Sequence, residues 1–548
     1  MVTRIRQTVT LDYDFIIVGA GSAGCVLAER LTVNGRHRVL LLEAGGSDHR
    51  FFIQMPLGYG KIFYDPSVNW MYRAEADPGL AGNRDYWPRG KVLGGSSSIN
   101  AMVYIRGHAK DYEDWERAGN RGWGWADVLK AYKAMEDNEA GAGPWRGSGG
   151  PLHVADVARD LHPLCHDYIQ AAGAVGLAFN SDFNGAEQEG VGFYQITVKG
   201  GRRMSAARAF LRPAMKRSNL RVETNAHATR IRFEGTRAVG VEYVKDGVTL
   251  QARAGREVIV SGGAVNSVQL LQLSGIGGAD LLKSHGIVVQ HDNPNVGAHL
   301  QDHVGINYTW RMKVPTLNDE LRPWWGKLRV GLRYLLTGHG PLSLSVNQGG
   351  GFFRTGPEQD RPNMQLYMQA FSTLMPREGE RPLLTPDPFP GLSLGLSNCR
   401  PTSRGDIVIR SADPFTHPRI TANAYSTEND MVEMLAAVKM LRRIAAQEPL
   451  KSLVAEELRP GPAVQSDNDL IADIRHRSGT VYHPSCTCRM GSDPASSVVD
   501  PRLRVHGIEA LRVCDASVFP ALIAGNTNAP AMMVGWRGAE IILEDAGG

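Results

Sequence analysis

Glycine residues at fixed spacing near the N-terminus have the pattern of a dinucleotide-binding loop. Gly19, Gly21 and Gly24 form a Gly-x-Gly-x-x-Gly sequence, with Ser22 and Ala23 between the second and the third glycine. The first glycine permits a tight turn, the second lets the backbone approach a pyrophosphate, and the third allows a helix to pack closely on a strand. The pyrophosphate would lie at the N-terminus of that helix, where free N–H groups and the helix dipole favour an anion.

The sequence around these glycines predicts the elements that such a loop needs. Residues 13–18 form a short apolar run typical of a buried parallel strand, residues 25–31 have helical spacing, and residues 38–43 predict a second strand. Glu43 closes that strand, about where a carboxylate accepts hydrogen bonds from an adenosine ribose. A chance glycine-rich turn is the alternative, but the complete order of elements disfavours it. The pattern does not distinguish FAD from NAD, because both contain ADP.

Length and composition indicate a large globular protein. A chain of 548 residues is longer than the chains that fold around a single hydrophobic core, so we expect two domains or one domain with insertions. The net charge of +4 is spread over 60 basic and 56 acidic residues, which does not suggest nucleic-acid binding. The cysteines are few and scattered, so a cytoplasmic location is the simpler expectation. Cys486 and Cys488 are one residue short of a Cys-x-x-Cys spacing, so we expect them to pack, and we expect no metal site.

Three segments bear on export and membranes. Residues 1–14 lack an apolar run of signal-peptide length, and the uncharged run 258–279 contains polar residues and glycines that favour a buried strand, turn and helix over a membrane span. Residues 322–336 predict a basic amphipathic helix able to lie on an anionic membrane. Its apolar face carries Trp325, Leu328, Leu332 and Leu335, and its charged residues include Lys327, Arg329 and Arg333. We favour the alternative, a helix at a domain surface whose apolar face packs inward.

Several blocks of the chain resemble the glucose-methanol-choline (GMC) oxidoreductases. Residues 89–107 resemble the family's first signature, and residues 263–277 resemble its second, with Val268 where the pattern has Pro or Ser. Further blocks follow in the family's order at residues 482–491, 512–517 and 525–530. Within the family, the resemblance is closest to choline dehydrogenases and to bacterial dehydrogenases of medium-chain alkanols.

The resemblance implies FAD as the cofactor. Some members attach FAD to a histidine just before the asparagine of the first signature; this chain has Ile99 there, so we expect non-covalent FAD. Taken alone, the glycine-serine loop is equally compatible with a surface loop that binds nothing. Trp70 and Ala228 fall where the family contacts the flavin and the adenine, respectively. The expected FAD contacts are Gly19, Gly21, Ser22, Ala23, Gly24, Glu43, Ala44, Trp70, Gly95, Ser96, Asn100, Ala101, Met102, Val103, Ala228, Asp515, Ala516 and Asn528.

The resemblance also implies a catalytic pair, His483 and Asn528. An alcohol becomes a hydride donor when its hydroxyl proton is removed, and histidine is a suitable base near neutral pH. We expect His483 to accept the proton, Asn528 to bind the substrate oxygen, and the hydride to pass to flavin N5. A helix expected after Ala529 and Pro530 would stabilise charge on the reduced flavin. Three histidines without such a motif are expected to be structural: His285, His303 and His476.

Together these features predict an α/β fold with a Rossmann-like FAD-binding domain and an α+β substrate-binding domain of sheet and helices. We expect the first to comprise residues 1–155, 200–310 and 465–548, the second residues 156–199 and 311–464, and the substrate pocket to lie between them. The expected reaction is oxidation of a primary alcohol to the aldehyde, with a quinone or another electron acceptor. An alcohol oxidase, a non-redox hydroxynitrile lyase and a nicotinamide-dependent reductase are the alternatives. Association with the inner face of the cell membrane stays open.

Overall fold

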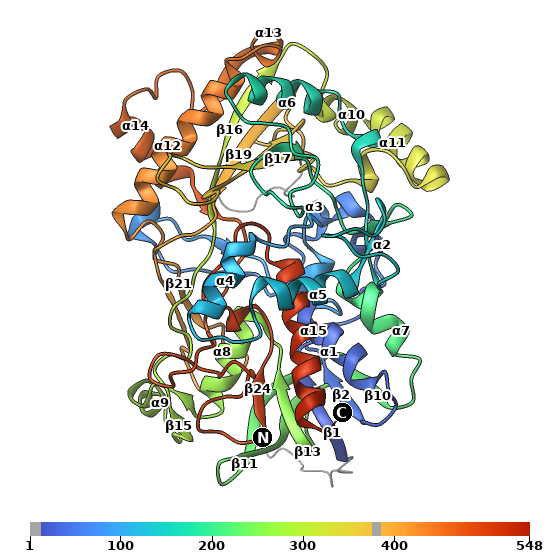
Figure 1. The fold of residues 1–548 in the computed structure, drawn as a ribbon, viewed down its shortest axis with the longest axis vertical. Helices are drawn as coiled ribbons and strands as arrows, with labels where there is room; N and C mark the ends of the chain where they lie inside the picture. Colours follow the sequence, from blue (N-terminus) through green and yellow to red (C-terminus); the bar gives the residue numbers. More distant parts are fainter. Residues whose placement is uncertain (1–11, 375–384, 548) are drawn as a thin grey trace.

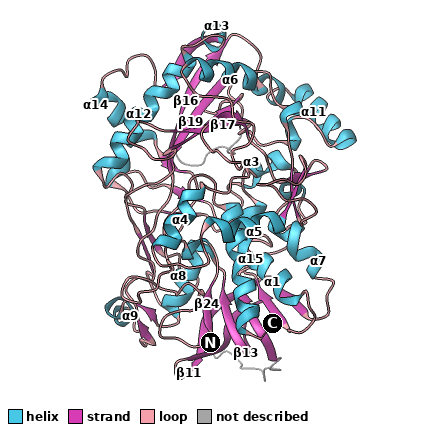
Figure 2. Cartoon of the chain, in the orientation of Figure 1, coloured by secondary structure: helices cyan, strands magenta, loops and turns pink. Residues whose placement is uncertain are grey.

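The computed structural model describes residues 12–374 and 385–547, and this part of the chain contains two seven-stranded sheets at opposite ends of the molecule (Figure 1, Figure 2). The order of the first sheet is β10 (Leu220–Glu223), β2 (Val39–Leu42), β1 (Asp12–Val18), β13 (Val248–Val260), β12 (Arg237–Lys245) and β11 (Ala226–Glu234), and β24 (Leu511–Val513) also pairs with β13. Strands β10, β2, β1, β13 and β24 run parallel, whereas β11, β12 and β13 form an antiparallel meander.

Helices cover the parallel strands, which explains why these strands are apolar along their length. All four residues of β2 are buried, as are the last four of β1. Helix α1 (Ser22–Thr32) follows β1 directly and packs against α15 (Asn528–Asp545), near the C-terminus (Figure 1). Helix α8 (Gly263–Leu273) follows β13 and contacts β11. Segments from both ends of the chain therefore build one domain.

The second sheet is antiparallel. Its order is β22 (Val454–Arg459), β16 (Val304–Met312), β19 (Gly391–Asn398), β18 (Met364–Gln369), β17 (Gly349–Phe353) and β7 (Gly190–Phe193), and β23 (Gly479–Thr480) pairs with β16. Helices α6 (Leu164–Ala174), α12 (Glu428–Ala445), α13 (Leu450–Leu453) and α14 (Asp467–Arg477) lie over its outer face (Figure 1). Strand β16 alternates: Tyr308 and Trp310 belong to the core beneath these helices, whereas Asn307 and Thr309 line a cavity on the other side.

The remaining elements surround the two sheets or lie between them (Figure 1). The remaining α-helices are α2 (Phe51–Gln54), α3 (Tyr59–Ile62), α4 (Ala109–Arg117), α5 (Trp125–Met135), α7 (Arg212–Ala214), α9 (Ala279–Ser284), α10 (Leu317–Leu321) and α11 (Trp324–Thr337). Two-stranded pairs are formed by β3 (Tyr72–Arg73) with β4 (Tyr86–Trp87), β5 (Glu136–Asn138) with β6 (Leu152–Val154), β8 (Val198–Lys199) with β9 (Arg202–Arg203), β14 (Ile276–Gly277) with β15 (His291–Asp292), and β20 (Asp406–Val408) with β21 (Arg419–Thr421).

The structure confirms the expected fold class and the strand, helix and strand at the N-terminus, which are β1, α1 and β2. The uncharged run 258–279 is the end of β13 followed by α8, as expected. The helix expected after Pro530 begins slightly earlier, at Asn528, because the first turn of a helix does not need the N–H group that proline lacks. In the two described ranges, no helix is both long and apolar enough to cross a membrane.

Two small regions belong to a different domain core from the one that the expected domain boundaries gave them. Leu470 and Ile474 of α14 belong to the core of the second sheet, because α14 packs on α12, although residues 465–548 were expected in the FAD-binding domain. Ile407 and Ile420, in β20 and β21, belong to the core of the first sheet. The exact domain limits stay a prediction. All six cysteines are buried and unpaired.

Candidate active site

A cavity of about 1580 Å³ lies between the two sheets. The first domain lines it with the loop after β1, the start of α1 and the end of β2. The second sheet contributes neutral polar side chains, among them Asn307, Tyr367 and Gln369. A space of this size and length is large enough for an extended dinucleotide together with a small substrate. The expected FAD contacts line this cavity, with the single exception of Gly24.

Two glycine loops meet at the bottom of the cavity. The N–H group of Gly94 donates to the carbonyl oxygen of Ala20 over 2.7 Å, and a Cβ on Gly95 would lie only 2.7 Å from Cα of Gly21. Gly21 caps α1 without a side-chain hydrogen bond, and no acidic residue stands in the first turn of this helix. The N–H groups at the start of α1 are therefore available to a phosphate, which fits a pyrophosphate at this position.

Gly24 has a packing role. A Cβ on Gly24 would lie 1.9 Å from the carbonyl oxygen of Gly19, so only glycine permits α1 to approach the loop this closely. Gly24 therefore holds the phosphate loop from behind, which is the function expected of the third glycine.

The carboxylate of Glu43 is held in place at the end of β2. One of its oxygens accepts from the N–H group of Ala20 over 2.9 Å, and the other accepts from that of Gly45 over 2.7 Å. Burial raises the pKa of Glu43 to about 7. Each oxygen has a second lone pair, so a ribose hydroxyl can still donate to this group from the cavity.

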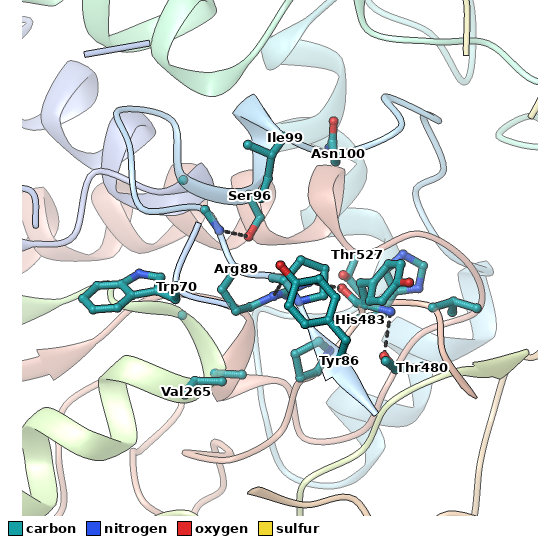
Figure 3. A pocket seen from close by; sticks show the side chains of 18 of the residues that line it. Trp70, Tyr86, Arg89, Ser96, Ile99, Asn100, Val265, Thr480, His483 and Thr527 are labelled. Carbon is teal, nitrogen blue, oxygen red and sulfur yellow. Dashed lines mark hydrogen bonds between the residues drawn. The ribbon is translucent and has the colours of Figure 1, made fainter. Parts of the chain in front are cut away.

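Aromatic rings mark one end of the cavity. Trp70 stacks on Tyr72 with ring centroids 5.9 Å apart, and the ring of His227 meets Trp70 edge-on at 5.5 Å. Ala228 follows His227 and lines the same space. Figure 3 shows Trp70 far from His483. Trp70 therefore lies beside Ala228, at the end that suits a base such as adenine, and not at the His483 end, where the flavin ring would meet the substrate.

A second histidine determines which nitrogen of His483 carries hydrogen. Nδ1 of His483 lies 2.9 Å from Nδ1 of His303, and Nε2 of His303 lies 3.0 Å from the carbonyl oxygens of Cys399 and Ile523. Because carbonyl oxygens only accept, Nε2 of His303 is the donor, so Nδ1 of neutral His303 must be an acceptor. Nδ1 of His483 therefore donates to His303, and Nε2 of His483 keeps its lone pair.

Both imidazoles are neutral near pH 7. Burial lowers the pKa of His303 to about 4. Burial lowers the pKa of His483 well below its ordinary value, and neighbouring His303 and Arg89 lower it further. His483 is therefore an unprotonated base at the wall of the cavity.

Hydrogen bonds fix the backbone at His483. Its N–H group donates to Oδ1 of Asp302 over 2.8 Å, and the hydroxyl of Thr480 donates to the same carboxylate. The guanidinium of Arg89 donates to the carbonyl oxygen of Tyr482, and Tyr482 has a positive φ of 72°. These contacts hold His483 at the start of the segment that leaves β23.

The structure brings Asn526, and not Asn528, to His483. Nδ2 of Asn526 lies 3.3 Å from Nε2 of His483, and Oδ1 of Asn526 accepts from Nε2 of Gln365 over 3.1 Å, which orients the amide. Oδ1 of Asn528 instead accepts from the hydroxyl of Ser22 over 2.8 Å, which joins the starts of α15 and α1. The sequence has two asparagines two positions apart, and only their directions in space distinguish them.

The three histidines expected to be structural, His285, His303 and His476, lie in different surroundings. His303 was expected to be only structural, but it is the hydrogen-bond partner of His483. His476 lines the cavity, and His285 does not. No motif in the sequence links His303 to His483, because their contact arises only when β16 and the C-terminal segment come together.

The site as a whole brings an unprotonated nitrogen of His483 and the amide donor of Asn526 together at one end of a cavity suited to a dinucleotide. Oxidation of an alcohol requires such a base and such a donor.

Comparisons with known proteins identify the family of this chain. The N-terminal model of the GMC oxidoreductase family matches residues 13–305, and the C-terminal model matches residues 401–535. The chain is 45% identical to an alcohol dehydrogenase (acceptor) of Pseudomonas putida, over 97% of this chain and 96% of that protein. It is 44% identical to the mitochondrial choline dehydrogenase of Homo sapiens, over 97% of this chain and 90% of that protein.

Solved structures show the same fold over nearly the whole chain. Pyridoxine 4-oxidase from Mesorbium loti has a TM-score of 0.87 at 30% identity and covers 97% of this chain and 99% of its own. Formate oxidase from Aspergillus oryzae, a structure concerned with its FAD, has a TM-score of 0.91 at 26% identity and covers 98% of this chain and 99% of its own. This chain belongs to the GMC oxidoreductase family, whose cofactor is FAD.

Proposed function

We propose that this FAD enzyme, whose family acts on CH–OH groups, oxidises a primary alcohol to the aldehyde with His483 as the base. FAD in the cavity would supply the acceptor for the hydride at its N5 atom. Nε2 of His483 removes the hydroxyl proton, and the oxygen that remains pushes electron density into the breaking C–H bond. The amide of Asn526 donates to this oxygen and holds the alcohol beside His483.

The observation that carries this proposal is the chain of contacts from two carbonyl oxygens through His303 to His483. It leaves a lone pair on Nε2, the nitrogen that approaches the amide of Asn526. A protonated His483 could not act as a base, and burial keeps it neutral. The start of α15, which lines the cavity at Asn528 and Ala531, has no side-chain cap and places its positive end near a cofactor that gains charge.

The wall of the cavity favours an uncharged alcohol. Among the described residues, the lining contains five arginines, Arg73, Arg84, Arg89, Arg459 and Arg477, and three carboxylates, Glu43, Asp85 and Asp515. A quaternary ammonium substrate such as choline would meet the rings of Phe63, Tyr64 and Tyr86 in this cavity, but the excess of positive charge disfavours a cation. Identity does not select between the two substrates, since it is 45% to the alcohol dehydrogenase and 44% to the choline dehydrogenase, so the choice rests on the charge of the lining.

We propose a quinone, and not oxygen, as the electron acceptor. The name of the Pseudomonas putida relative specifies an acceptor, whereas bacterial relatives at 39–40% identity are named oxygen-dependent choline dehydrogenases. An oxygen-using oxidase is therefore the second candidate, and oxygen consumption during turnover distinguishes it from a dehydrogenase. Nothing in the cavity specifically favours a hydroxynitrile lyase.

The test is anaerobic reduction of the bound flavin. The purified protein should show a flavin spectrum, and 1-octanol or benzyl alcohol should bleach it faster than choline does. The variant His483→Ala should keep its FAD and lose bleaching by about a hundredfold or more. A yellow protein that no alcohol reduces, or a His483→Ala variant as fast as the wild type, would contradict the proposal.

A further inference from the structure

Helix α11 presents its large apolar side chains to solvent. The exposed fractions of these side chains range from 49% to 82% in Trp324, Trp325, Leu328, Leu332, Leu335 and Leu336. Inward packing of this face was the favoured expectation from the sequence, and it is wrong. A helix at the surface of a domain normally buries such residues and exposes its polar ones, so the arrangement needs another explanation.

Helix α11 packs against the protein through Gly326, Val330 and Tyr334. Gly326 and Val330 are buried, and the hydroxyl of Tyr334 donates to the carbonyl oxygen of Gly201 over 3.0 Å. A Cβ on Gly326 would lie 2.2 Å from the carbonyl oxygen of Glu320, so this face packs closely against the neighbouring helix α10. At about 100° per residue, Gly326, Val330 and Tyr334 share one side, and the exposed apolar residues form an arc of about 120° on the opposite side.

Basic residues flank this arc. Helical spacing places Lys327 on one edge and Arg329 and Arg333 on the other, and residues 322–340 contain no acidic residue. Arg329 pairs with Glu320 at 3.4 Å and Arg333 with Asp160 at 3.5 Å, both on the exposed surface, where such pairs are weak. The surface therefore combines an apolar arc, two tryptophans and positive edges.

These properties of the α11 surface match one kind of binding partner, a membrane interface. Apolar side chains that enter the acyl boundary, tryptophans at the headgroup level and cations beside anionic headgroups are the features of a helix that lies in a membrane interface. A second copy of the chain is less suitable, because a two-fold pairing would bring identical basic edges together. We propose that α11 is an interfacial helix that binds the protein to the surface of a membrane containing anionic phospholipid.

The position of α11 relates this surface to the cavity. Helix α11 contacts the turn at Pro341–Ser343, and the chain then reaches Val346 and Asn347, which line the cavity. Val346 packs with Tyr59 and Met102 in one buried cluster, and all three residues line the cavity. If the proposed function holds, a lipid-soluble acceptor or alcohol would meet the protein on this side; the binding of membrane itself does not depend on that function.

Co-sedimentation of the FAD-loaded protein with vesicles tests the proposal. We expect the wild type to sediment with phosphatidylcholine vesicles that contain phosphatidylglycerol, and less with phosphatidylcholine alone. The double variant Leu328→Glu/Leu332→Glu should lower the bound fraction about tenfold or more, and Arg329→Gln/Arg333→Gln should remove the preference for anionic lipid. The control is Val432→Glu, at a residue that is 59% exposed in helix α12, and Figure 1 shows α12 on the opposite side of the second sheet from α11.

Separate measurements test whether the variants fold and whether they keep their activity. All variants should keep the flavin spectrum, the Tm and the rate of dye reduction by alcohol without vesicles, because α11 does not line the cavity. A protein that binds vesicles but reduces no dye would refute the proposed function and leave this inference intact. Absence of sedimentation with either vesicle would overturn it, as would a dimer in light scattering that only Leu328→Glu/Leu332→Glu dissociates, since α11 would then bind a second copy.

Discussion

Nδ1 of His303 lies 2.9 Å from Nδ1 of His483, although the two residues are 180 positions apart in the chain. His303 has both nitrogens occupied, because its Nε2 faces the carbonyl oxygens of Cys399 and Ile523. The pair therefore acts as a fixed acceptor and an oriented base. This contact explains how a buried histidine can present one particular nitrogen to a substrate.

Replacement of His303 tests this relationship. In His303→Ala, His483 loses its acceptor and kcat should fall about tenfold or more. His303 also lowers the pKa of His483, so its removal should raise that pKa and move the acidic limb of kcat/KM to higher pH. His303→Gln should recover part of the rate, because its carboxamide oxygen can accept from Nδ1. A loss of rate with an unchanged pH profile and no rescue would reduce His303 to a packing residue.

The two asparagines should separate substrate chemistry from cofactor binding. Asn526→Ala removes the amide at 3.3 Å from His483 and should slow anaerobic flavin reduction about a hundredfold. Asn528→Ala breaks the contact with Ser22 at the phosphate loop, so it should weaken FAD retention more than it slows reduction of the FAD-loaded enzyme. The opposite pattern would restore Asn528 as the partner of His483.

The glycines of the phosphate loop provide a matched pair. A Cβ on Gly21 would lie 3.9 Å from the carbonyl oxygen of Ser261, an ordinary contact, and within 4 Å of no other described residue beyond its chain neighbours. Gly21→Ala should therefore fold with a Tm near the wild type and lose FAD affinity about tenfold or more. In Gly24→Ala, a contact of 1.9 Å with Gly19 forces the helix away, so we expect a large fall in Tm. Thermal unfolding and flavin content measure both effects. Equal Tm values for the two variants would refute this division of roles.

Glu43 should make the stability of the FAD-free protein depend on pH. Burial raises its pKa in the folded state from 4.5 to about 7, so folding favours the protonated form. Its contribution to stability is then complete below pH 4.5 and is lost as the pH rises toward about 7. The decrease in Tm over this window should be smaller in Glu43→Gln than in the wild type. Identical slopes would show that Glu43 does not titrate there.

The sequence by itself determined the local features of this protein. The strand before Gly19, the helix after Gly21 and the carboxylate at Glu43 follow from short-range periodicity and from backbone needs that only glycine meets. The resemblance across the chain indicated the family, the cofactor and His483, and the comparisons confirmed the first two.

The tertiary structure alone decided which groups meet. Asn526 and Asn528 have the same chemistry, and the turn before α15 directs only the first toward His483. The contact of His303 with His483 exists only because the fold places the start of β16 beside the C-terminal segment. The periodicity of residues 324–337 predicts an apolar face but not which side of the helix faces the protein, and in the folded chain Gly326 and Val330 are buried while the apolar face is exposed. Spacing along a chain defines faces and turns, whereas contacts between distant segments depend on how those faces pack.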